Sequence, residues 1–508
     1  MANLWLKKPI NELLLDSESG GLKRTLGATN LVLIGIGAII GAGLFVRTAA
    51  AAANSAGPSV TIAFIIGALG CAFAGLCYAE FASMIPIAGS AYTYSYATMG
   101  EFLAWIIGWD LVLEYALGAA TVSIAWSEYF NKFLEYFIGP AWAIPYEWCH
   151  SPFQSVVDPL TNVTLHQGII NLPAIFILAV LTWVLIRGIQ QSATINGVIV
   201  VIKVMIVLLV IAFGWQFIDA ANHTPYIPSP GTDHATVNGV VKFFKPIEGG
   251  WFGIVSAAGT IFFAFIGFDA VSTTAQEAKN PKRDMPIGII GSLIICTFLY
   301  ILFAHVLTGI AHYSEFQGAS GEAPVANAIE HHMTGFGWLA KLITIAILFG
   351  FSSVMMVMLL GQSRVFYTMS KDGLVPPIFS VLHSKFQTPY RSNLLFLGFV
   401  GLFAAFVPGE IVGDMVSVGT LFAFILVCIS VIIMRKREPD LERPFRVPFV
   451  PLIPILGVAI CGYMIFGLHW QNWMRLFVWL AIGLILYFSY GIKNSRLQNK
   501  NIFRDSLD

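Results

Sequence analysis

The sequence predicts an all-α integral membrane protein with 12 transmembrane helices, and three observations support this fold class. Of its 508 residues, 57% are hydrophobic and 11% are charged, and the mean hydropathy is +0.77. Average soluble proteins carry roughly 25% charged residues. Apolar runs of about 20 residues, the length that crosses a bilayer core of about 30 Å, recur along the chain. The basic residues gather in alternate connections between these runs. Together these features exclude a soluble enzyme.

The predicted spans follow one another with polar or Pro/Gly-containing connections between them. In chain order they cover residues 30–51, 60–85, 102–131, 169–187, 195–217, 252–276, 286–311, 338–369, 391–407, 410–434, 450–469 and 473–492. The ninth and tenth lie so close around Pro408 and Gly409 that one broken segment is an alternative. An even number of spans returns both chain ends to the same side of the membrane.

The distribution of basic residues predicts the orientation. With the N-terminus in the cytoplasm, 21 of the 28 Lys and Arg residues fall inside, six fall outside, and Lys203 lies within a span. Cytoplasmic connections are enriched in Lys and Arg. The first 29 residues contain no apolar stretch of the kind found in signal peptides. We therefore expect a multi-pass protein of the plasma (inner) membrane with both termini in the cytoplasm.

Several function classes are disfavoured by what the sequence lacks. The formal net charge is zero, so no overall positive field would attract nucleic acid. The six cysteines and ten histidines show no spacing typical of a metal site or a disulfide framework. No nucleophile elbow, zinc-protease or phosphate-loop motif is present. We expect no enzyme activity, no cofactor and no metal.

The first span contains four glycines in the run from Gly35 to Gly43. Glycine costs about 1 kcal/mol relative to alanine inside a helix, and its free backbone suits an unwound turn. Such a turn is tolerated in a membrane only where it faces protein or a polar cavity. Close glycine-mediated helix packing is the alternative interpretation.

The sixth span is interrupted in a similar way by Gly267 and Asp269. If spans 1–5 and 6–10 are two copies of one unit, the second copy must be inverted, because five is odd. Inverted repeats with broken helices are typical of secondary transporters. The predicted organisation is a tail (1–29), a first repeat (30–217), a second repeat (252–434), two further helices (450–492) and a second tail (493–508).

Two broken helices offer complementary binding groups. Free N–H groups at the start of a half-helix bind an anion such as a carboxylate. Free carbonyls at the end of another half-helix bind an ammonium group. The pair therefore predicts a zwitterionic substrate.

Four segments resemble the amino acid-polyamine-organocation superfamily, and within it the bacterial cationic amino acid transporter family. They are residues 35–45, 78–96, 266–281 and 361–373. The resemblance extends over about residues 23–450. It implies the leucine-transporter fold, a 5+5 inverted repeat with helices 1 and 6 broken and helices 11 and 12 outside the repeat. It also implies proton symport or exchange.

The resemblance assigns a substrate site to the two breaks. The amides around Gly41, Ala42 and Gly43 would receive the substrate carboxylate, and the carbonyls near Phe263, Ala264 and Ile266 would receive its ammonium group. Ile40 would also belong to this substrate site. Phe263 or Phe265 would form part of an aromatic lid. Several relatives have threonine where this chain has Ala42, so one carboxylate contact is lost here.

Lys203 lies about 12 Å into the fifth span, which is further than a lysine side chain easily reaches to the membrane surface. The resemblance places this lysine against the break in helix 1 and near Ser352 or Ser353 of helix 8. We predict that Lys203 couples transport to protons. Snorkelling or a simple structural pairing is the alternative.

Three acidic residues are further candidates. Glu114 would border the substrate pocket and favour cationic side chains; as an alternative it is a buried, protonated structural group, with Asp110 one turn away. Asp269 would act in a gate, or alternatively cap the second half-helix. Glu277 precedes a basic loop and would take part in an inner gate, or alternatively anchor the interface.

The sequence therefore predicts a secondary active transporter that symports L-amino acids, cationic or broadly neutral, with protons across the plasma membrane by alternating access. An amino acid exchanger is the main alternative, and a channel or non-transporting sensor is a further one. The expected partners are an amino acid, protons and the lipid bilayer. The sequence identifies no accessory subunit.

Overall fold

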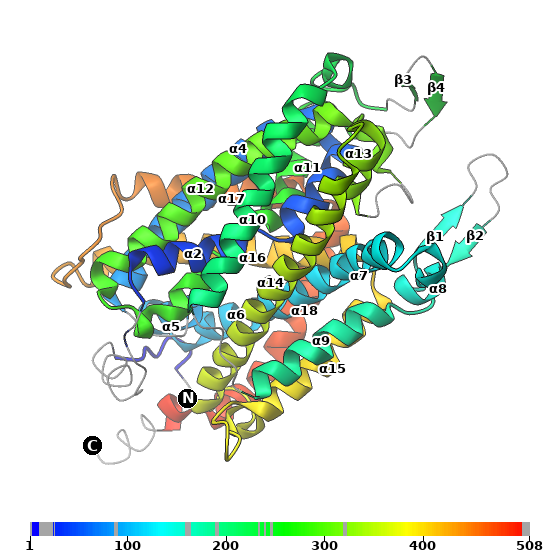
Figure 1. Ribbon diagram of the computed structural model, residues 1–508. Helices are drawn as coiled ribbons and strands as arrows, with labels where there is room; N and C mark the ends of the chain where they lie inside the picture. Colours follow the sequence, from blue (N-terminus) through cyan, green and yellow to red (C-terminus); the bar gives the residue numbers. More distant parts are fainter. Residues whose placement is uncertain are drawn as a thin grey trace, which may run out of the picture.

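A computed structural model describes a helical protein in which apolar segments far apart in sequence are packed together (Figure 1). The described residues are 3–9, 24, 26–85, 90–157, 164–187, 193–231, 234–237, 240–243, 247–317 and 323–499. The predicted tails include residues 10–23 and 500–508, which lie outside these ranges. Because apolar side chains recur through every segment, the helices bury one face against each other and leave another to a nonpolar surrounding.

Each predicted span contains helix. The helices are α2 (Ala28–Ile39), α4 (Val60–Met84), α6 (Glu101–Val112), α7 (Gly118–Phe137), α9 (Leu172–Ile186), α10 (Ala193–Gly214), α11 (Gly250–Ile261), α12 (Pro281–Ile310), α14 (Gly337–Lys371), α15 (Tyr390–Phe406), α16 (Gly409–Arg437), α17 (Leu452–Gly467) and α18 (Trp470–Leu486). Helices α6 and α7 are joined by a π-helical turn and make one long segment. The ninth and tenth spans form the separate helices α15 and α16.

Eight helical segments of the described chain are long and apolar enough to cross a membrane. Four shorter apolar helices, α2, α9, α15 and α17, accompany them. The short helix α2 ends at one of the predicted breaks, so its length reflects an interruption rather than a polar boundary. Twelve crossings remain a prediction.

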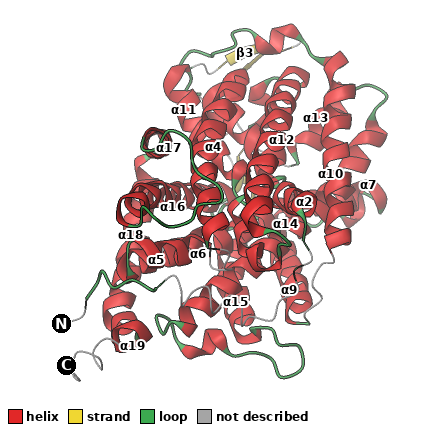
Figure 2. Ribbon diagram, turned by 90° about the vertical axis from the view of Figure 1, so that its left-hand side faces the viewer, coloured by secondary structure: helices red, strands yellow, loops and turns green. Residues whose placement is uncertain are grey.

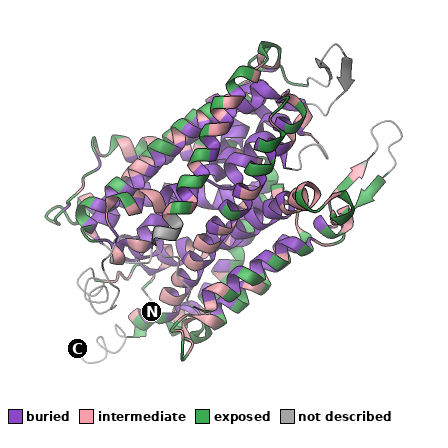
Figure 3. Cartoon of the chain, viewed as in Figure 1, coloured by how far each residue is buried: buried purple, intermediate pink, exposed green. Residues whose placement is uncertain are grey.

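The helices pack around a central group that contains α2, α4, α12, α14 and α16. Helix α12 packs against both α4 and α2, whereas α9 and α15 lie side by side on one flank (Figures 1 and 2). Burial is concentrated in the centre, and exposed residues lie along the outer faces of α9, α10 and α15 (Figure 3). On α10 the exposed side chains are apolar, as Val201 and Met205 illustrate, which fits contact with lipid.

The two ends of the bundle differ. Two β-hairpins lie at one end, which we call the hairpin end: β1 (Ser155–Val157) pairs with β2 (Thr164–Gln167), and β3 (His234–Val237) pairs with β4 (Val240–Phe243) (Figure 1). The described residues nearest both chain termini lie at the opposite end, the terminus end. These hairpins were not predicted.

The described residues also form five short α-helices. They are α3 (Thr48–Ala51), α5 (Ser90–Thr98), α8 (Tyr146–Cys149), α13 (Pro324–His332) and α19 (Ile492–Asn494). All nine residues of α5 are buried, although the segment is not apolar enough to stand out as a span. It lies at the terminus end, next to α6 and α16.

Candidate binding site at two helix breaks

The first segment is interrupted within the glycine run. Helix α2 ends at Ile39, and Ile40 has extended backbone angles (φ −73°, ψ 103°). A π-helical turn, Gly43–Arg47, then resumes the segment. Ile40 and Gly41 therefore lie between two helical pieces, and residues 40–43 are all buried. The Ile40 amide still donates to the Ile36 carbonyl at 2.9 Å, so it is not one of the free amides that the sequence predicted.

The sixth segment is interrupted in the same part of the molecule. Helix α11 ends at Ile261 and continues as a short 3-10 turn, Phe262–Phe265. Ile266 is extended (φ −60°, ψ 138°), Gly267 has a φ of +115°, and a second 3-10 segment, Asp269–Glu277, follows. A positive φ is readily adopted by glycine, so Gly267 permits this turn.

The two breaks touch each other through their backbones. A Cβ on Gly43 would lie 2.2 Å from the Cα of Ala264, and a Cβ on Gly267 would lie 2.9 Å from the Ala38 carbonyl group. Any larger residue at either glycine would push the breaks apart. The glycines thus serve the contact between two unwound segments, beyond simple packing of intact helices.

Tyr300 joins the two breaks and was not predicted. Its hydroxyl, on α12, donates to the carbonyls of Ile39 (2.8 Å) and Ala264 (2.9 Å). The side chain is fully buried. The available sequence signal was a single tyrosine within an apolar span, which also occurs in ordinary helix packing.

The aromatic candidates lie in different surroundings. The ring of Phe265 packs against Phe64 and Tyr300, so it faces α4 and α12. Phe263 is 4% exposed, one residue before the backbone contact with Gly43. Ala42 is buried in the first break, where it offers only its peptide group.

Lys203 reaches the first break from α10. Its Nζ donates to the carbonyl of Gly37 at 2.9 Å and to that of Ile40 at 3.0 Å. The side chain is 3% exposed, so it does not snorkel to the membrane surface. Instead, it caps carbonyls that the end of α2 leaves without helical partners.

Helix α14 makes room for this lysine. A Cβ on Gly350 would lie 2.8 Å from the Lys203 Cε, so only glycine allows the side chain to pass so closely. Ser353 is buried three residues further along, on the same helix face. The Ser352 hydroxyl donates to the Leu348 carbonyl at 2.8 Å.

Glu114 belongs to a buried acidic cluster that also contains Asp269. The Tyr115 hydroxyl donates to Asp269 Oδ2 at 2.5 Å, and the Glu114 carboxyl group lies beside Asp269 and Thr420. Within the described residues, neither Glu114 oxygen nor Asp269 Oδ1 receives a hydrogen bond. Phe268, not Asp269, is the N-cap residue of the second half-helix. The sequence predicted Asp110 as the neighbour of Glu114, and it did not predict that Asp269, a separate candidate, lies beside Glu114.

One ion pair lies at each end of this region. At the hairpin end, the Arg47 guanidinium pairs with Asp414 of α16 and packs over Gly413, where a Cβ would lie 3.2 Å from its Cζ. At the terminus end, Glu277 pairs with Arg364 of α14 at 3.3 Å.

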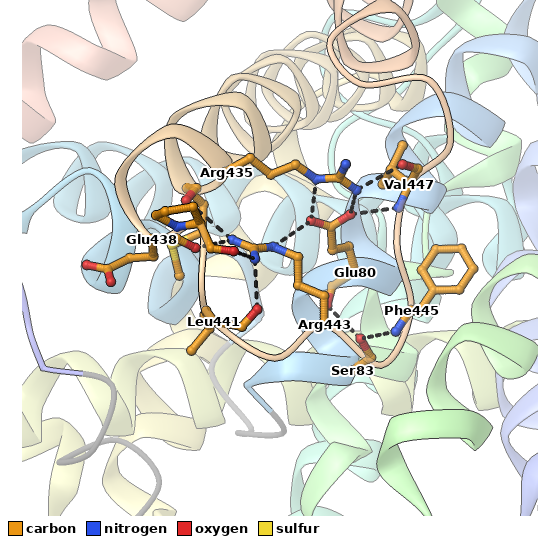
Figure 4. A network of polar contacts seen from close by, with 10 residues as sticks. Glu80, Ser83, Arg435, Glu438, Leu441, Arg443, Phe445 and Val447 are labelled. Atoms are coloured by element: carbon orange, nitrogen blue, oxygen red, sulfur yellow. Dashed lines mark hydrogen bonds and ion pairs between the residues drawn. The ribbon is translucent and has the colours of Figure 1, made fainter.

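Glu80 forms a second polar network at the terminus end (Figure 4). This α4 residue is 1% exposed and binds the Arg435 guanidinium through both carboxylate oxygens, at 3.1 and 2.6 Å. It also accepts from the Val447 amide at 2.7 Å and pairs with Arg443 at 3.6 Å. The network fixes α4 to α16 and to the connection that leads into α17.

Comparison with known proteins identifies a family for this chain. A family model described as amino acid permease matches residues 26–490. The branched-chain amino acid permease BcaP of Bacillus subtilis is 42% identical over 97% of this chain and 99% of its own length. The methylthioribose transporter of the same organism is 38% identical over 98% and 100%. The chloroplastic cationic amino acid transporter 9 of Arabidopsis thaliana is 36% identical over 94% and 79%.

These matches cover nearly the whole chain, including both helix breaks, Lys203 and the acidic cluster. They support a multi-pass membrane protein and connect it with permeases and transporters rather than with enzymes. The chain therefore belongs to the amino acid permease family, within the amino acid-polyamine-organocation superfamily.

Proposed function

We propose that the protein accumulates L-amino acids by proton symport, through alternating access of a site between the two helix breaks. The observation that carries the proposal is the position of Lys203, whose Nζ binds two carbonyls of the first break. A titratable group fixed to the binding segment links protonation to the shape of the site.

The substrate would lie where the unwound segments meet. Its carboxylate would bind amides of residues 41–43, and its ammonium group would bind carbonyls of residues 263–266. The Ala264 carbonyl already accepts from Tyr300, and one of its two lone pairs remains for a further donor. The two backbone poles recognise the common part of every α-amino acid and leave its side chain to the surrounding residues.

Coupling would follow from charge and from hydrogen bonding. A protonated Lys203 holds the end of α2 through two bonds and places a positive charge near the amides that receive the carboxylate. The ammonium and the carboxylate would therefore favour each other's binding. Loss of the proton removes a donor and that charge, which loosens the break and releases the substrate.

For the side chain we propose aliphatic neutral amino acids as the first candidate. The first break is lined by apolar groups, with Val354 3.2 Å from a Cβ on Gly41 and with Phe45 against Phe303 and Phe351. BcaP, named for branched-chain amino acids, shares 42% of its residues with this chain. An aliphatic side chain gains roughly 25 cal/mol per Å² buried in such surroundings.

A cationic side chain is the second candidate, and Glu114 favours it. Its two oxygens and Asp269 Oδ1 receive no hydrogen bond from the described residues, although all lie in the protein interior. A buried acceptor without a donor is costly. An ammonium or guanidinium group that reached the cluster would supply the missing donors.

We further propose the topology that the sequence predicts: twelve crossings, two inverted repeats of five helices and the terminus end in the cytoplasm of a plasma membrane. The Arg47–Asp414 and Glu277–Arg364 pairs would then close the outer and inner ends of the route in turn. Alternating access requires that these two pairs part at different stages of the cycle.

Uptake by purified protein in liposomes tests the proposal. Labelled leucine should accumulate above its outside concentration when an inward proton gradient is imposed, and a proton ionophore should abolish the accumulation. Accumulation that requires amino acid preloaded inside the liposomes and does not depend on the proton gradient would identify an exchanger. Equilibration without accumulation would indicate a channel, and binding without uptake a sensor.

A further inference from the structure

Described residues near the two ends of the chain, Asn3 and Gln498 among them, meet close to a buried carboxylate. Glu101, the first residue of α6, is completely buried. Its two oxygens accept hydrogen bonds from the side chains of Tyr96 (2.9 Å), Tyr487 (3.1 Å), Ser495 (2.5 Å) and Gln498 (3.4 Å). Tyr487, Ser495 and Gln498 come from the chain that follows α18, so this carboxylate anchors the C-terminal segment, residues 495–499.

Gln498 in turn holds the N-terminal strap, residues 3–9. Its Nε2 donates to the Asn3 carbonyl at 2.7 Å, and its Oε1 accepts from the Asn3 amide at 3.1 Å. The strap also supplies acceptors for the first amides of α6: Glu101 N donates to the Leu6 carbonyl at 2.9 Å, and Phe102 N to the Leu4 carbonyl at 3.1 Å. These amides have no partner within their own helix.

A glycine permits the strap to lie so close to α6. Gly100 has a φ of +106°, and a Cβ there would lie 2.8 to 2.9 Å from backbone atoms of Trp5. Gly100, the residue just before α6, therefore gives the strap room to lie against the start of this helix.

The strap also fixes the buried helix α5. The Lys8 amide donates to the Tyr96 carbonyl at 3.3 Å, and the Lys8 Nζ pairs with Asp372 at 3.1 Å. Asp372, at the end of α14, accepts from the Tyr92 hydroxyl at 2.8 Å. On its other side, α5 contacts the segment beyond the second break, where the Ser272 hydroxyl donates to that of Ser90 at 3.3 Å.

We propose that the strap and the C-terminal segment form a latch that holds α5 across the terminus end of the transport route, and that this latch must part before the substrate leaves on that side. The inference rests on the proposed function, which makes the terminus end an exit.

The chemistry of the contacts suits a latch. Glu101 is held by uncharged donors, each of which can exchange its hydrogen bond for one to water at a small net cost. Loss of one donor also makes the remaining hydrogen bonds to Glu101 easier to break, because a buried carboxylate with only some of its hydrogen bonds is costly. The hydrogen bonds between Glu101 and the C-terminal segment therefore form together, and they can break together when water reaches the carboxylate.

A reversible crosslink tests the latch. Asn3→Cys and Gln498→Cys would be combined and joined with a short bis-methanethiosulfonate reagent; the six native cysteines are all buried and give little background. We expect the crosslinked protein to bind leucine with unchanged affinity and to take it up at least tenfold more slowly in liposomes. A reductant should restore uptake, and either single-cysteine variant should ignore the reagent.

Two results would overturn the latch: uptake by the crosslinked protein at the rate of the single-cysteine variants, or loss of leucine binding together with uptake. A second measurement holds even if the protein does not transport leucine. Ser272→Cys, buried behind α5, should react several-fold faster with a water-soluble maleimide when Gln498→Ala is added. The matched control is Asn499→Ala, at an exposed neighbour. Equal labelling rates would contradict the latch and leave the proposed function untouched.

Discussion

At the scale of single residues, the candidate site depends on side chains that repair interrupted backbone. Lys203 and Tyr300 come from different helices, and both donate to carbonyls that the breaks release. Neither is part of a broken segment. Their roles show how a membrane interior can tolerate unwound peptide groups, since the carbonyls of residues 37, 39, 40 and 264 receive donors from neighbouring helices.

Replacing Lys203 should separate coupling from binding. In Lys203→Met, we expect proton-driven accumulation of leucine to fall at least tenfold, because no titratable donor contacts the break. Exchange of internal for external leucine should persist. The measurement is uptake with and without a proton gradient, and Lys341→Met, on the exposed part of α14, is the matched control. Full pH-dependent accumulation in Lys203→Met would refute the coupling role.

Replacing Glu114 should reveal the preferred side chain. Glu114→Gln replaces one carboxyl oxygen of the buried cluster with Asp269 by an amide NH2 group, which cannot accept a hydrogen bond, while keeping the shape of the side chain. If cationic side chains reach this cluster, arginine should lose at least tenfold in its ability to compete with labelled substrate, and alanine should lose less than twofold. Equal losses for both would remove Glu114 from the specificity pocket.

Sequence reasoning reached the residues whose chemistry is unusual for their surroundings. Lys203 stands out because a lysine within an apolar span demands an explanation, and the glycine runs stand out because they weaken a helix. Tyr300 and Thr420 do not stand out, since a hydroxyl within a span is common. The pairing of Glu114 with Asp269 depends on the packing of two distant helices, which no local pattern records.

At the scale of elements, the two breaks can touch only because glycines at the contact carry no side chain. The segments meet at Gly43 and Ala264, and again at Gly267 and Ala38, without side chains between them. This contact explains why the helices are interrupted at glycine-rich positions and why the interruptions lie together. The apolar runs allowed the helices themselves to be predicted, including their approximate ends.

Adding one methyl group at the contact should disrupt binding. The Cβ of Gly43→Ala would lie 2.2 Å from the Cα of Ala264, a backbone position that cannot turn aside. We expect leucine binding to weaken at least tenfold, measured by equilibrium binding to the purified protein. Gly462→Ala on α17, where a Cβ meets nothing within 4 Å, is the matched control and should bind normally. Normal binding by Gly43→Ala would contradict a site at this contact.

Other elements lay beyond sequence reasoning for a physical reason. Helix α5 is buried but polar, so it lacks the hydropathy that marked the spans. The hairpins β1–β2 and β3–β4 lie in connections whose composition is that of ordinary loops. Short elements of this kind are stabilised by tertiary contacts more than by their own pattern.

At the scale of the whole molecule, buried polar networks tie helices that are distant in the chain. Glu80 links α4 to α16 and to the segment before α17, and Glu101 links both chain ends to α6 (Figure 4 for Glu80). Both networks lie at the terminus end. The hairpin end has its own link in the Arg47–Asp414 pair. The molecule is therefore held together at each end by contacts between separate helices.

Breaking the Glu80 network should destabilise the protein. Glu80→Gln leaves the buried Arg443 guanidinium and the partly exposed Arg435 guanidinium without their carboxylate, and breaking a buried ion pair typically costs about 3–5 kcal/mol. We expect a clear fall in the apparent melting temperature in detergent. The matched control is Glu442→Gln, since Glu442 and Lys282 form an exposed pair, and such pairs contribute about 0–1 kcal/mol. Equal melting temperatures for the two variants would show that the Glu80 network stabilises the protein no more than an exposed ion pair does.

The phenol of Tyr300 has a single hydrogen, yet it serves two acceptors, one on each broken segment. Such sharing divides the bond, so an amino group arriving at Ala264 would allow the phenol to turn fully towards Ile39. Binding of an amino group at the second break would then change the hydrogen bonding of the first break through rotation of one hydroxyl, before any helix moves.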